Sequence, residues 1–257
     1  MILSRRVALG GFQLDEIHER IVIRSVDPGT TDENVQTVSR MGGVGQRVTG
    51  AHWEKLEATV EFGIDIPKRD LAGRREVFEA VKSWAMRRGW LTTNEMPGRR
   101  MFVDKVILPS GGDLWNWTES MEITFRALNV PFWQDETPGI AAENLITNGD
   151  ISIDVSGNVT GVLDAEFTNR SGQTINRLSI TAGGNTISFT NLALGGTDTL
   201  AISQGTDGLL RITAGGVSVL DKRTGADDLY VAPGNNIVTI AAERAGSLTV
   251  RNWGRWI

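Results

Sequence analysis

Only two histidines and no cysteines are present in this 257-residue chain to bind a metal or support nucleophilic catalysis. The lack of cysteine excludes disulfides, thiolate catalysis, iron–sulfur clusters and cysteine zinc sites. His18 and His52 do not fall in a spacing that indicates a metal site, and a Ser-His-Asp arrangement would need one of them. For His52, in the stretch TGAHWEK, we expect a half-buried, hydrogen-bonded structural side chain.

Adjacent carboxylates are the second candidate for chemistry. They occur at three places: Asp15 with Glu16, Asp135 with Glu136, and Asp227 with Asp228. A glycosidase needs two carboxylates from separate elements that face each other across a cleft, one of them desolvated. Adjacent acidic residues in turn-like contexts are more often solvated, so the sequence does not favour a catalytic pair.

The glycine-rich stretch GGVGQRVTG is the third candidate, because glycine loops can hold nucleotide phosphates. Gly43 and Gly45 supply the start of a G-x-G-x-x-G pattern, but Val48 occupies the third glycine position, and no strand–turn–helix context follows. We interpret the stretch as a loop that carries Arg40 and Arg47. The sequence therefore predicts no catalytic residue, no cofactor-binding residue and no metal ligand, and a protein that is not an enzyme.

The composition is that of an ordinary globular protein. Hydrophobic residues make up 40% of the chain and charged residues 22%, which suffices for a core without disulfide or metal staples. The formal net charge of −5 argues against a broad cationic surface for nucleic acid. Because no apolar run is long enough for a signal peptide or a membrane span, we expect a soluble chain that is made in the cytoplasm.

Two halves of different composition meet near residue 140, at the stretch ALNVPFWQDETPG. Six of the eight Trp residues lie at or before Trp133, whereas the second half is rich in Gly, Thr, Asn and aliphatic residues. Such a shift across a polar segment bracketed by proline and glycine indicates a domain boundary, with Phe132 and Trp133 anchoring the end of the first domain. The expected parts are a first domain over residues 1–133, a solvated linker over 134–147 and a second domain over 148–257. A surface loop inside a single domain is the alternative.

The first half is predicted to mix strands with one helix. Strict alternation of apolar and polar residues predicts strands over residues 56–66 and 121–127, each with one apolar face. Apolar residues at helical spacing predict a helix over 69–88, and Pro97 with Gly98 predicts a turn. Residues 28–50 form a long, polar, glycine-rich connection, and connections of this length usually have a function. The helix stripe consists of Leu71, Phe78, Val81 and Ala85, with Val77 and Trp84 beside it.

The second half is predicted to be all β. Short alternating runs recur between turn signals, and the similar stretches LSITAGGNTISF and LRITAGGVSVLD each predict a hairpin with a Gly-Gly turn, as in a β-sandwich. Tyr230, Trp253 and Trp256 are the strong aromatic candidates for stacking on a sugar. We expect all three to be buried, with the two tryptophans docking the last strand.

The order of these elements resembles the distal tail proteins of long-tailed bacteriophages. The family's I-T-F signature and Pro-Phe-Trp-like strand end correspond to residues 123–125 and 131–133. One departure is Asn129-Val130 before the proline, where the family has a more polar residue. The other matching stretches are LEATVEFGIDI, REVFEAVKSWAMRRG, WLTTNEMPGRRMFVDKV, GGDLWNWTE, LRITAGGVSVLD, DDLYVAPGNNIVTI and GSLTVRNW.

The resemblance implies a mainly β protein with one prominent helix. An α+β, tail-tube-like N-terminal domain would form a ring, and a galectin-like or carbohydrate-module-like β-sandwich would project outward. It further implies a non-enzymatic structural protein of the virion tail tip or baseplate, made in the host bacterial cytoplasm. The implied partners are other copies in a hexameric ring, the tail tube protein, the tail hub or tail-associated lysin, the end of the tape measure protein and, in some members, receptor-binding proteins.

The residues themselves fit this reading in three ways. Subunits of a ring make head-to-tail contacts, which closing strands can supply. The connection 28–50 could reach a neighbour, with Arg40 and Arg47 pairing with acidic residues there. A net acidic subunit suits a channel through which DNA slides without binding, because like charge repels phosphate.

Two other functional classes stay open. In the first, the C-terminal β-sandwich is a carbohydrate-binding module that contacts host-surface glycans directly. In the second, the chain is a virion-associated hydrolase, against which the sparse histidines and absent cysteines argue.

Overall fold

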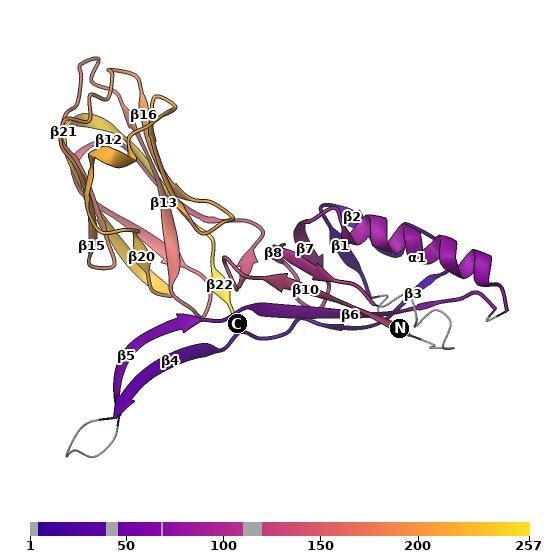
Figure 1. Ribbon diagram of the computed structural model, residues 1–257. Coiled ribbons are helices and arrows are strands. Elements are labelled where there is room, and N and C mark those ends of the chain that lie inside the picture. Colours follow the sequence, from indigo (N-terminus) through magenta and orange to yellow (C-terminus); the bar gives the residue numbers. More distant parts are fainter. Residues whose placement is uncertain (1–4, 40–45, 68, 110–119) are drawn as a thin grey trace. The chain divides into compact units, whose positions relative to one another are not determined.

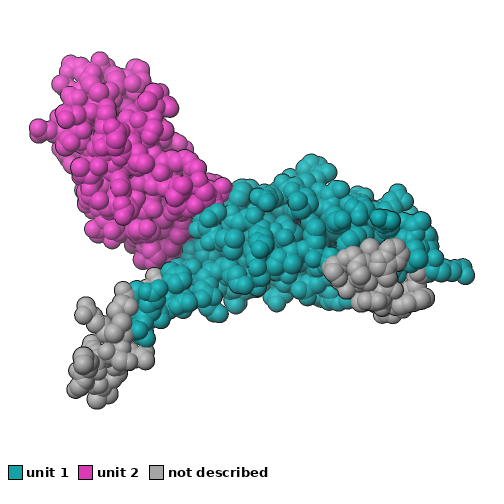
Figure 2. Space-filling view, viewed as in Figure 1, with its two compact units in different colours: residues 1–133 teal, residues 134–257 magenta. Residues whose placement is uncertain are grey.

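The computed structural model describes residues 5–39, 46–67, 69–109 and 120–257, and the chain divides into two compact units. Unit 1 comprises Met1–Trp133 and unit 2 comprises Gln134–Ile257 (Figure 2). Strands dominate both units, and the described residues contain a single α-helix (Figure 1). The predicted fold class, mainly β with one prominent helix, is therefore confirmed. None of the described residues belong to a helix that is both long and apolar enough to cross a bilayer.

Unit 1 contains three antiparallel β arrangements and the helix. Its sheets have the orders β2-β1-β7-β8, β3-β6-β10-β9 and β4-β5. The elements are β1 (Val7–Leu9), β2 (Phe12–Gln13), β3 (Ile21–Asp27), β4 (Glu33–Ser39), β5 (Gln46–Trp53), β6 (Leu56–Ile64), α1 (Leu71–Ala85), β7 (Gly89–Thr93), β8 (Arg99–Val103), β9 (Lys105–Ile107), β10 (Met121–Ala127) and β11 (Trp133–Asp135), which spans the unit boundary.

The sheet β3-β6-β10-β9 has one buried and one polar face, as the alternation predicts. Alternate residues of β10, and of β6 as far as Phe62, are buried, and the residues between them are at least partly exposed. Strands β6 and β10 pair from Leu56 with Ala127 to Phe62 with Met121, so buried residues oppose buried residues throughout. A slip by one residue would turn every apolar side chain outward, and the burial therefore fixes the register.

Helix α1 supplies the apolar partner of this sheet. Its Trp84 packs edge-on against Phe125 of β10, with ring centroids 5.8 Å apart, and donates from Nε1 to the Phe12 carbonyl at 2.7 Å. The helix is shorter than the predicted range 69–88: Asp70 caps its start by accepting from the Gly73 amide, and it ends at Ala85 with Met86 as the cap, before the backbone turns left-handed at Arg88, φ 56°. The buried face is confirmed, except that Leu71 is 46% exposed.

Residues 28–50, predicted as a connection, instead contain most of the β4–β5 hairpin (Figure 1). We call this hairpin the arm. The strands pair from Glu33 with Trp53 to Ser39 with Gln46. The prediction of a loop was wrong because residues 32–37 are all exposed, so the arm shows no apolar and polar alternation. Arg40 lies outside the described residues, and of Arg47 only the backbone is described.

The root of the arm is fixed by the Pro-Phe-Trp end of unit 1. Trp133 is fully buried and donates from Nε1 to the Pro28 carbonyl at 3.0 Å. Phe132 meets Trp53, the last residue of β5, edge-on at 5.5 Å between centroids. The hydroxyl of Thr31 donates to the Glu54 carbonyl at 2.8 Å, closing the hairpin base. The expected anchoring role of Phe132 and Trp133 is observed, and it anchors the arm as well.

Unit 2 is built entirely from strands and one short 3-10 helix among its residues 134–257. The two predicted Gly-Gly hairpins are present as β14–β15 and β17–β18. The elements are β12 (Gly139–Val155), β13 (Gly161–Asn169), β14 (Leu178–Ala182), β15 (Asn185–Phe189), β16 (Thr199–Gln204), β17 (Leu210–Ala214), β18 (Val217–Ser218), η2 (Leu220–Lys222), β19 (Arg223–Gly225), β20 (Tyr230–Val231), β21 (Gly234–Asn252) and β22 (Arg255–Trp256).

Two long strands join the layers of unit 2. The first part of β21 pairs with β14, its last part pairs with β13, and β12 pairs with β21 along both parts. Each strand therefore runs from one layer into the other around a single apolar core. Strand β12 begins at Gly139, inside the segment 134–147 that the sequence assigned to a linker, and Gly139 already pairs with Asn252.

Gly29 provides a test of the arm root. Its φ is +67°, and a Cβ there would overlap the Glu57 carbonyl, whereas Gly98, at φ +72°, has open space around it. Both Gly→Ala substitutions carry the left-handed backbone cost of about 1–2 kcal/mol. We expect Gly29→Ala to lower the free energy of unfolding by about 1–3 kcal/mol more, through overpacking, as measured by urea denaturation. Equal losses at Gly29 and Gly98 would contradict this close packing.

Candidate functional site

The two histidines occupy different environments. His18 is half-buried, and its Nδ1 accepts from the Arg20 amide at 3.1 Å. His52 is exposed on β5, so the prediction of a half-buried His52 was wrong: the arm that carries it is solvated on both sides at this point. Within the described part of the chain, no group of three His, Asp or Glu residues is placed to hold a metal ion.

The adjacent carboxylates do not form facing pairs. Asp227 is exposed and pairs with Arg223 at 3.0 Å, whereas its neighbour Asp228 is 7% exposed. Asp135 accepts from Trp256 Nε1 at 2.8 Å and from the Ser156 hydroxyl, while Glu136 is exposed. The expectation of simple solvation therefore fails for Asp135 and Asp228, each of which belongs to a hydrogen-bonded arrangement.

Asp228 belongs to a buried polar cluster with Asp164, Gln204 and Arg255, which the sequence did not reveal. Gln204 links all three. Its backbone N–H donates to Asp164 at 3.1 Å, its side-chain Nε2 donates to Asp228 at 3.4 Å, and its Oε1 accepts from Arg255 at 2.6 Å. Trp253 Nε1 donates to the other Asp164 oxygen at 3.3 Å. The cluster ties the C-terminal segment to β13 and β16, as predicted for Trp253.

The burial of this cluster shifts the pKa of each charged member. Desolvation raises the pKa of Asp164, against the hydrogen bonds from Gln204 and Trp253, and raises the pKa of Asp228, against the charge of Arg255. Desolvation likewise lowers the pKa of Arg255. Most of these polar atoms bond to one another and so link the C-terminal segment to β13 and β16, while Asp228 Oδ1 is buried without a hydrogen-bond partner among the described residues.

The polar face of the sheet β3-β6-β10-β9 is a stronger candidate for function. On this face, residues of β6 and β10 that pair across the strands form three rows. These are Glu61 opposite Glu122, Thr59 opposite Thr124, and Glu57 opposite Arg126. Asp27 extends the second row, and Lys105 extends the third. Like charges directly opposite each other destabilise a sheet, so the Glu61–Glu122 pair is not explained by folding stability.

Hydrogen bonds lower the pKa of two carboxylates on this face, Glu61 and Glu57. Those from Ser120 and Ser25 lower the pKa of Glu61, with the Ser25 hydroxyl 2.8 Å from Oε2. A hydrogen bond from Lys55 is the largest cause lowering the pKa of Glu57, which also forms an ion pair with Arg126. The face therefore presents fixed negative charge together with paired basic side chains.

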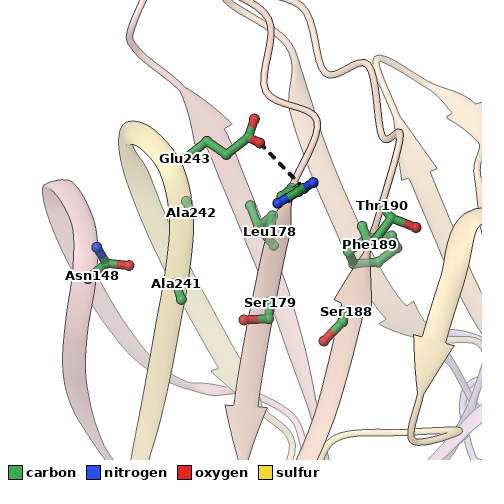
Figure 3. Close-up of a pocket in the computed structure, with 10 residues that line it drawn as sticks. Asn148, Leu178, Ser179, Ser188, Phe189, Thr190, Ala241, Ala242 and Glu243 are labelled. Carbon is green, nitrogen blue, oxygen red and sulfur yellow. Dashed lines mark ion pairs between the residues drawn. The ribbon is translucent and has the colours of Figure 1, made fainter.

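A groove of about 360 Å³ crosses the outer face of unit 2 (Figure 3). Its central row consists of Asn148, Ala241, Ser179 and Ser188, directly opposite one another on β12, β21, β14 and β15. The groove is open here because the side chains of this row are small. The remaining lining residues are Arg177, Leu178, Phe189, Thr190, Ala242 and Glu243.

The aromatic residues singled out in the sequence lie away from this groove. Trp253 and Trp256 are partly buried and bonded through their indole nitrogens to Asp164 and Asp135. Tyr230 is 42% exposed on β20, so the prediction of its burial was wrong. None of these three residues lines the groove.

No protein-family model and no curated protein sequence matches this chain. Among solved structures, the chain is similar to the Dit (gp 19.1) protein of phage SPP1, described as a paradigm of the hub adsorption apparatus in phages that infect Gram-positive bacteria. That match has a TM-score of 0.62 and 12% identity and covers 96% of this chain and 98% of the other. A chain of the phage p2 baseplate in its activated conformation matches with a TM-score of 0.49 and 9% identity, over 97% of each chain. The chain thus has a Dit-like fold, and the resemblance seen in the sequence is confirmed.

The buried polar cluster predicts opposite pH responses for two aspartates. In the wild type, the pKa of Asp228 is raised in the folded state. Its contribution to the free energy of unfolding is therefore largest at low pH and is lost as the pH rises through this pKa. Asn imitates the protonated acid, so Asp228→Asn should gain stability relative to wild type between about pH 4 and about pH 7. Urea denaturation of the full chain at both pH values measures this change.

Asp207 is the matched control. It is exposed, and a hydrogen bond from Arg211 lowers its pKa, so its contribution is present at neutral pH and is lost on acidification. Asp207→Asn should therefore lose stability relative to wild type as the pH rises through the acidic range toward about pH 4, and it should change little between about pH 4 and about pH 7. The same sign of change for both variants would contradict the assignment.

Proposed function

We propose that this protein is a structural component of a phage tail tip or baseplate, in which copies close into a hexameric ring that connects the tail tube to the tail hub. The Dit-like fold supports this role. Unit 1 would form the ring and unit 2 would lie outside it, available to adhesion components. The partners would be the tail tube protein, the hub or tail-associated lysin, the end of the tape measure protein and receptor-binding proteins. On this proposal its location is the virion, and its work is not enzymatic.

The observation that carries the proposal is the pair of open edges of the sheet β3-β6-β10-β9. All its strands pair antiparallel, and β3 and β9 end the order without a further described neighbour. Because the number of strands is even, β3 and β9 run in opposite directions. The β9 edge of one copy can therefore join the β3 edge of the next with antiparallel pairing. Repetition of this head-to-tail contact by rotation closes a ring without leaving edges.

The polar face supports the same arrangement. In a closed sheet the apolar face must point toward helix α1, so the polar face would line the central channel. The chain's net charge of −5 belongs to unit 2, since residues 1–133 contain 18 acidic and 18 basic residues, whereas residues 134–257 contain 13 acidic and 8 basic. In unit 1 it is the acidic row of Glu61 and Glu122, rather than net charge, that would repel DNA phosphate.

The arm supports contact with a neighbour. Residues 32–37, which include most of β4, are all exposed and add nothing to the core of unit 1. Its root is rigid, because Trp53 packs on Phe132 and Trp133 binds the Pro28 carbonyl. A rigidly anchored hairpin whose first strand is exposed over residues 33–37 is suited to lie on an adjacent subunit.

The seam between copies can be tested at Ile107, which is 37% exposed on edge strand β9. Ile107→Lys places a charge on the edge, a substitution that discourages strand pairing. We expect the concentration for half-assembly to rise by about tenfold or more, as measured by light scattering over a dilution series. The control is Ile140→Lys, at an Ile that is 60% exposed on β12 of unit 2, where assembly should be unchanged. If both variants assembled equally well, the β9 edge would not be part of the contact between copies.

The arm can be removed without disturbing its root. Asn34 and His52 face each other across the hairpin, so residues 35–51 can be replaced by a two-residue Asn-Gly turn. We expect the shortened chain to keep its thermal unfolding profile and to lose stable rings in negative-stain images. Rings of unchanged abundance would show that the arm is not needed for assembly.

A further inference from the structure

The groove of unit 2 contains polar groups that the protein itself does not use. The side chains of Asn148, Ser179, Ser188 and Thr190 make no hydrogen bond to any described residue. The next row of the same sheet differs, because Thr181 bonds to Thr186 at 2.8 Å and Thr239 donates to Asp150 at 2.6 Å. Unpaired donors and acceptors are thus gathered in the hollow row, whereas those of the neighbouring row are satisfied.

We infer that this groove is a binding site for a neutral saccharide. Hydroxyl groups and an amide both donate and accept, which matches the alternating donors and acceptors of a polyol. The volume of about 360 Å³ lies within the range of small-ligand sites. The site goes beyond the structural role proposed above and gives a location for the glycan contact that the sequence left open.

The charges at the rim argue for a neutral ligand. Arg177 and Glu243 form an ion pair at 3.9 Å, and the carboxylate of Glu243 also accepts from the Asn176 amide at 2.8 Å (Figure 3). The only charged residues that line the groove are therefore one base and one acid, each already engaged. An anionic ligand at the guanidinium of Arg177 would lie beside the carboxylate of Glu243, which repels it.

The floor of the groove sets the strength of binding. Phe189 is the one aromatic residue among those that line it, and it is 1% exposed, so no ring is presented for a sugar to stack on. Binding through hydrogen bonds alone is weak, and we expect dissociation constants of about 1 mM or above for one site. Copies held in a ring would combine such sites by avidity, a step that rests on the proposed assembly.

The test compares matched variants in ligand-observed saturation-transfer NMR of the full chain. Ser179→Val with Ser188→Val removes both groove hydroxyls, and Thr181→Val with Thr186→Val makes the same change in the neighbouring row. The neutral probes are lactose, maltose and N-acetylglucosamine, and the anionic probe is glycerol 1-phosphate. Light scattering of the same samples reports assembly separately, so loss of binding and loss of the ring are distinguished.

We expect saturable binding of at least one neutral probe to the wild type and to the control variant, and about tenfold weaker binding to the groove variant. If the double variant does not fold, Asn148→Ala at an exposed position replaces it, and we expect it to weaken binding of the neutral probe as well. The inference is overturned by the absence of saturable binding of any neutral probe to the wild type. It is also overturned by equal binding to the groove variant, or by stronger binding of glycerol 1-phosphate.

Discussion

Burial of alternate side chains on one face of the sheet β3-β6-β10-β9 is the constraint on which unit 1 depends. Leu56, Ala58, Val60 and Phe62 are all fully buried, and burying each large apolar side chain stabilises the fold by about 1.5–3 kcal/mol. That energy fixes the register, and the register in turn fixes which residues form the polar face. Among the described strands, the same sheet has two edges without a neighbour, and proteins ordinarily cover or charge such edges. On the proposed assembly, fold and ring are linked, because the sheet that builds the core would also present the surface for another copy.

In both units, the last residues of the unit are held in place by specific contacts. In unit 1 the last residues before the boundary, Phe132 and Trp133, hold the root of the arm some hundred positions earlier in the sequence. In unit 2 the last residues are held by the buried polar cluster, in which Arg255 and Trp253 reach Gln204 and Asp164. The end of unit 2 is thus fixed by hydrogen bonds to residues of β16 and β13. Rigid ends suit a protein whose proposed role is to hold others in place.

The sequence predicted those elements whose residues contact a core. Strands β6 and β10 and helix α1 bury one face each, so their period is visible, and the Gly-Gly turns mark the hairpins of unit 2. The arm was missed because neither side of β4 is buried over most of its length, and the environment of His52 was missed with it. The polar cluster joins residues 164, 204, 228 and 255, and the groove depends on which strands lie side by side. Neither arrangement leaves a local pattern, since each brings together residues that are far apart in the sequence.

The most direct test of this account is the mass and shape of the wild-type protein in solution, measured by light scattering and negative-stain imaging over a range of concentrations. The account predicts a particle of about six times the 28.0 kDa subunit mass, with a central hole. A particle of 28.0 kDa at every concentration, including in the presence of the tail tube protein, would contradict it.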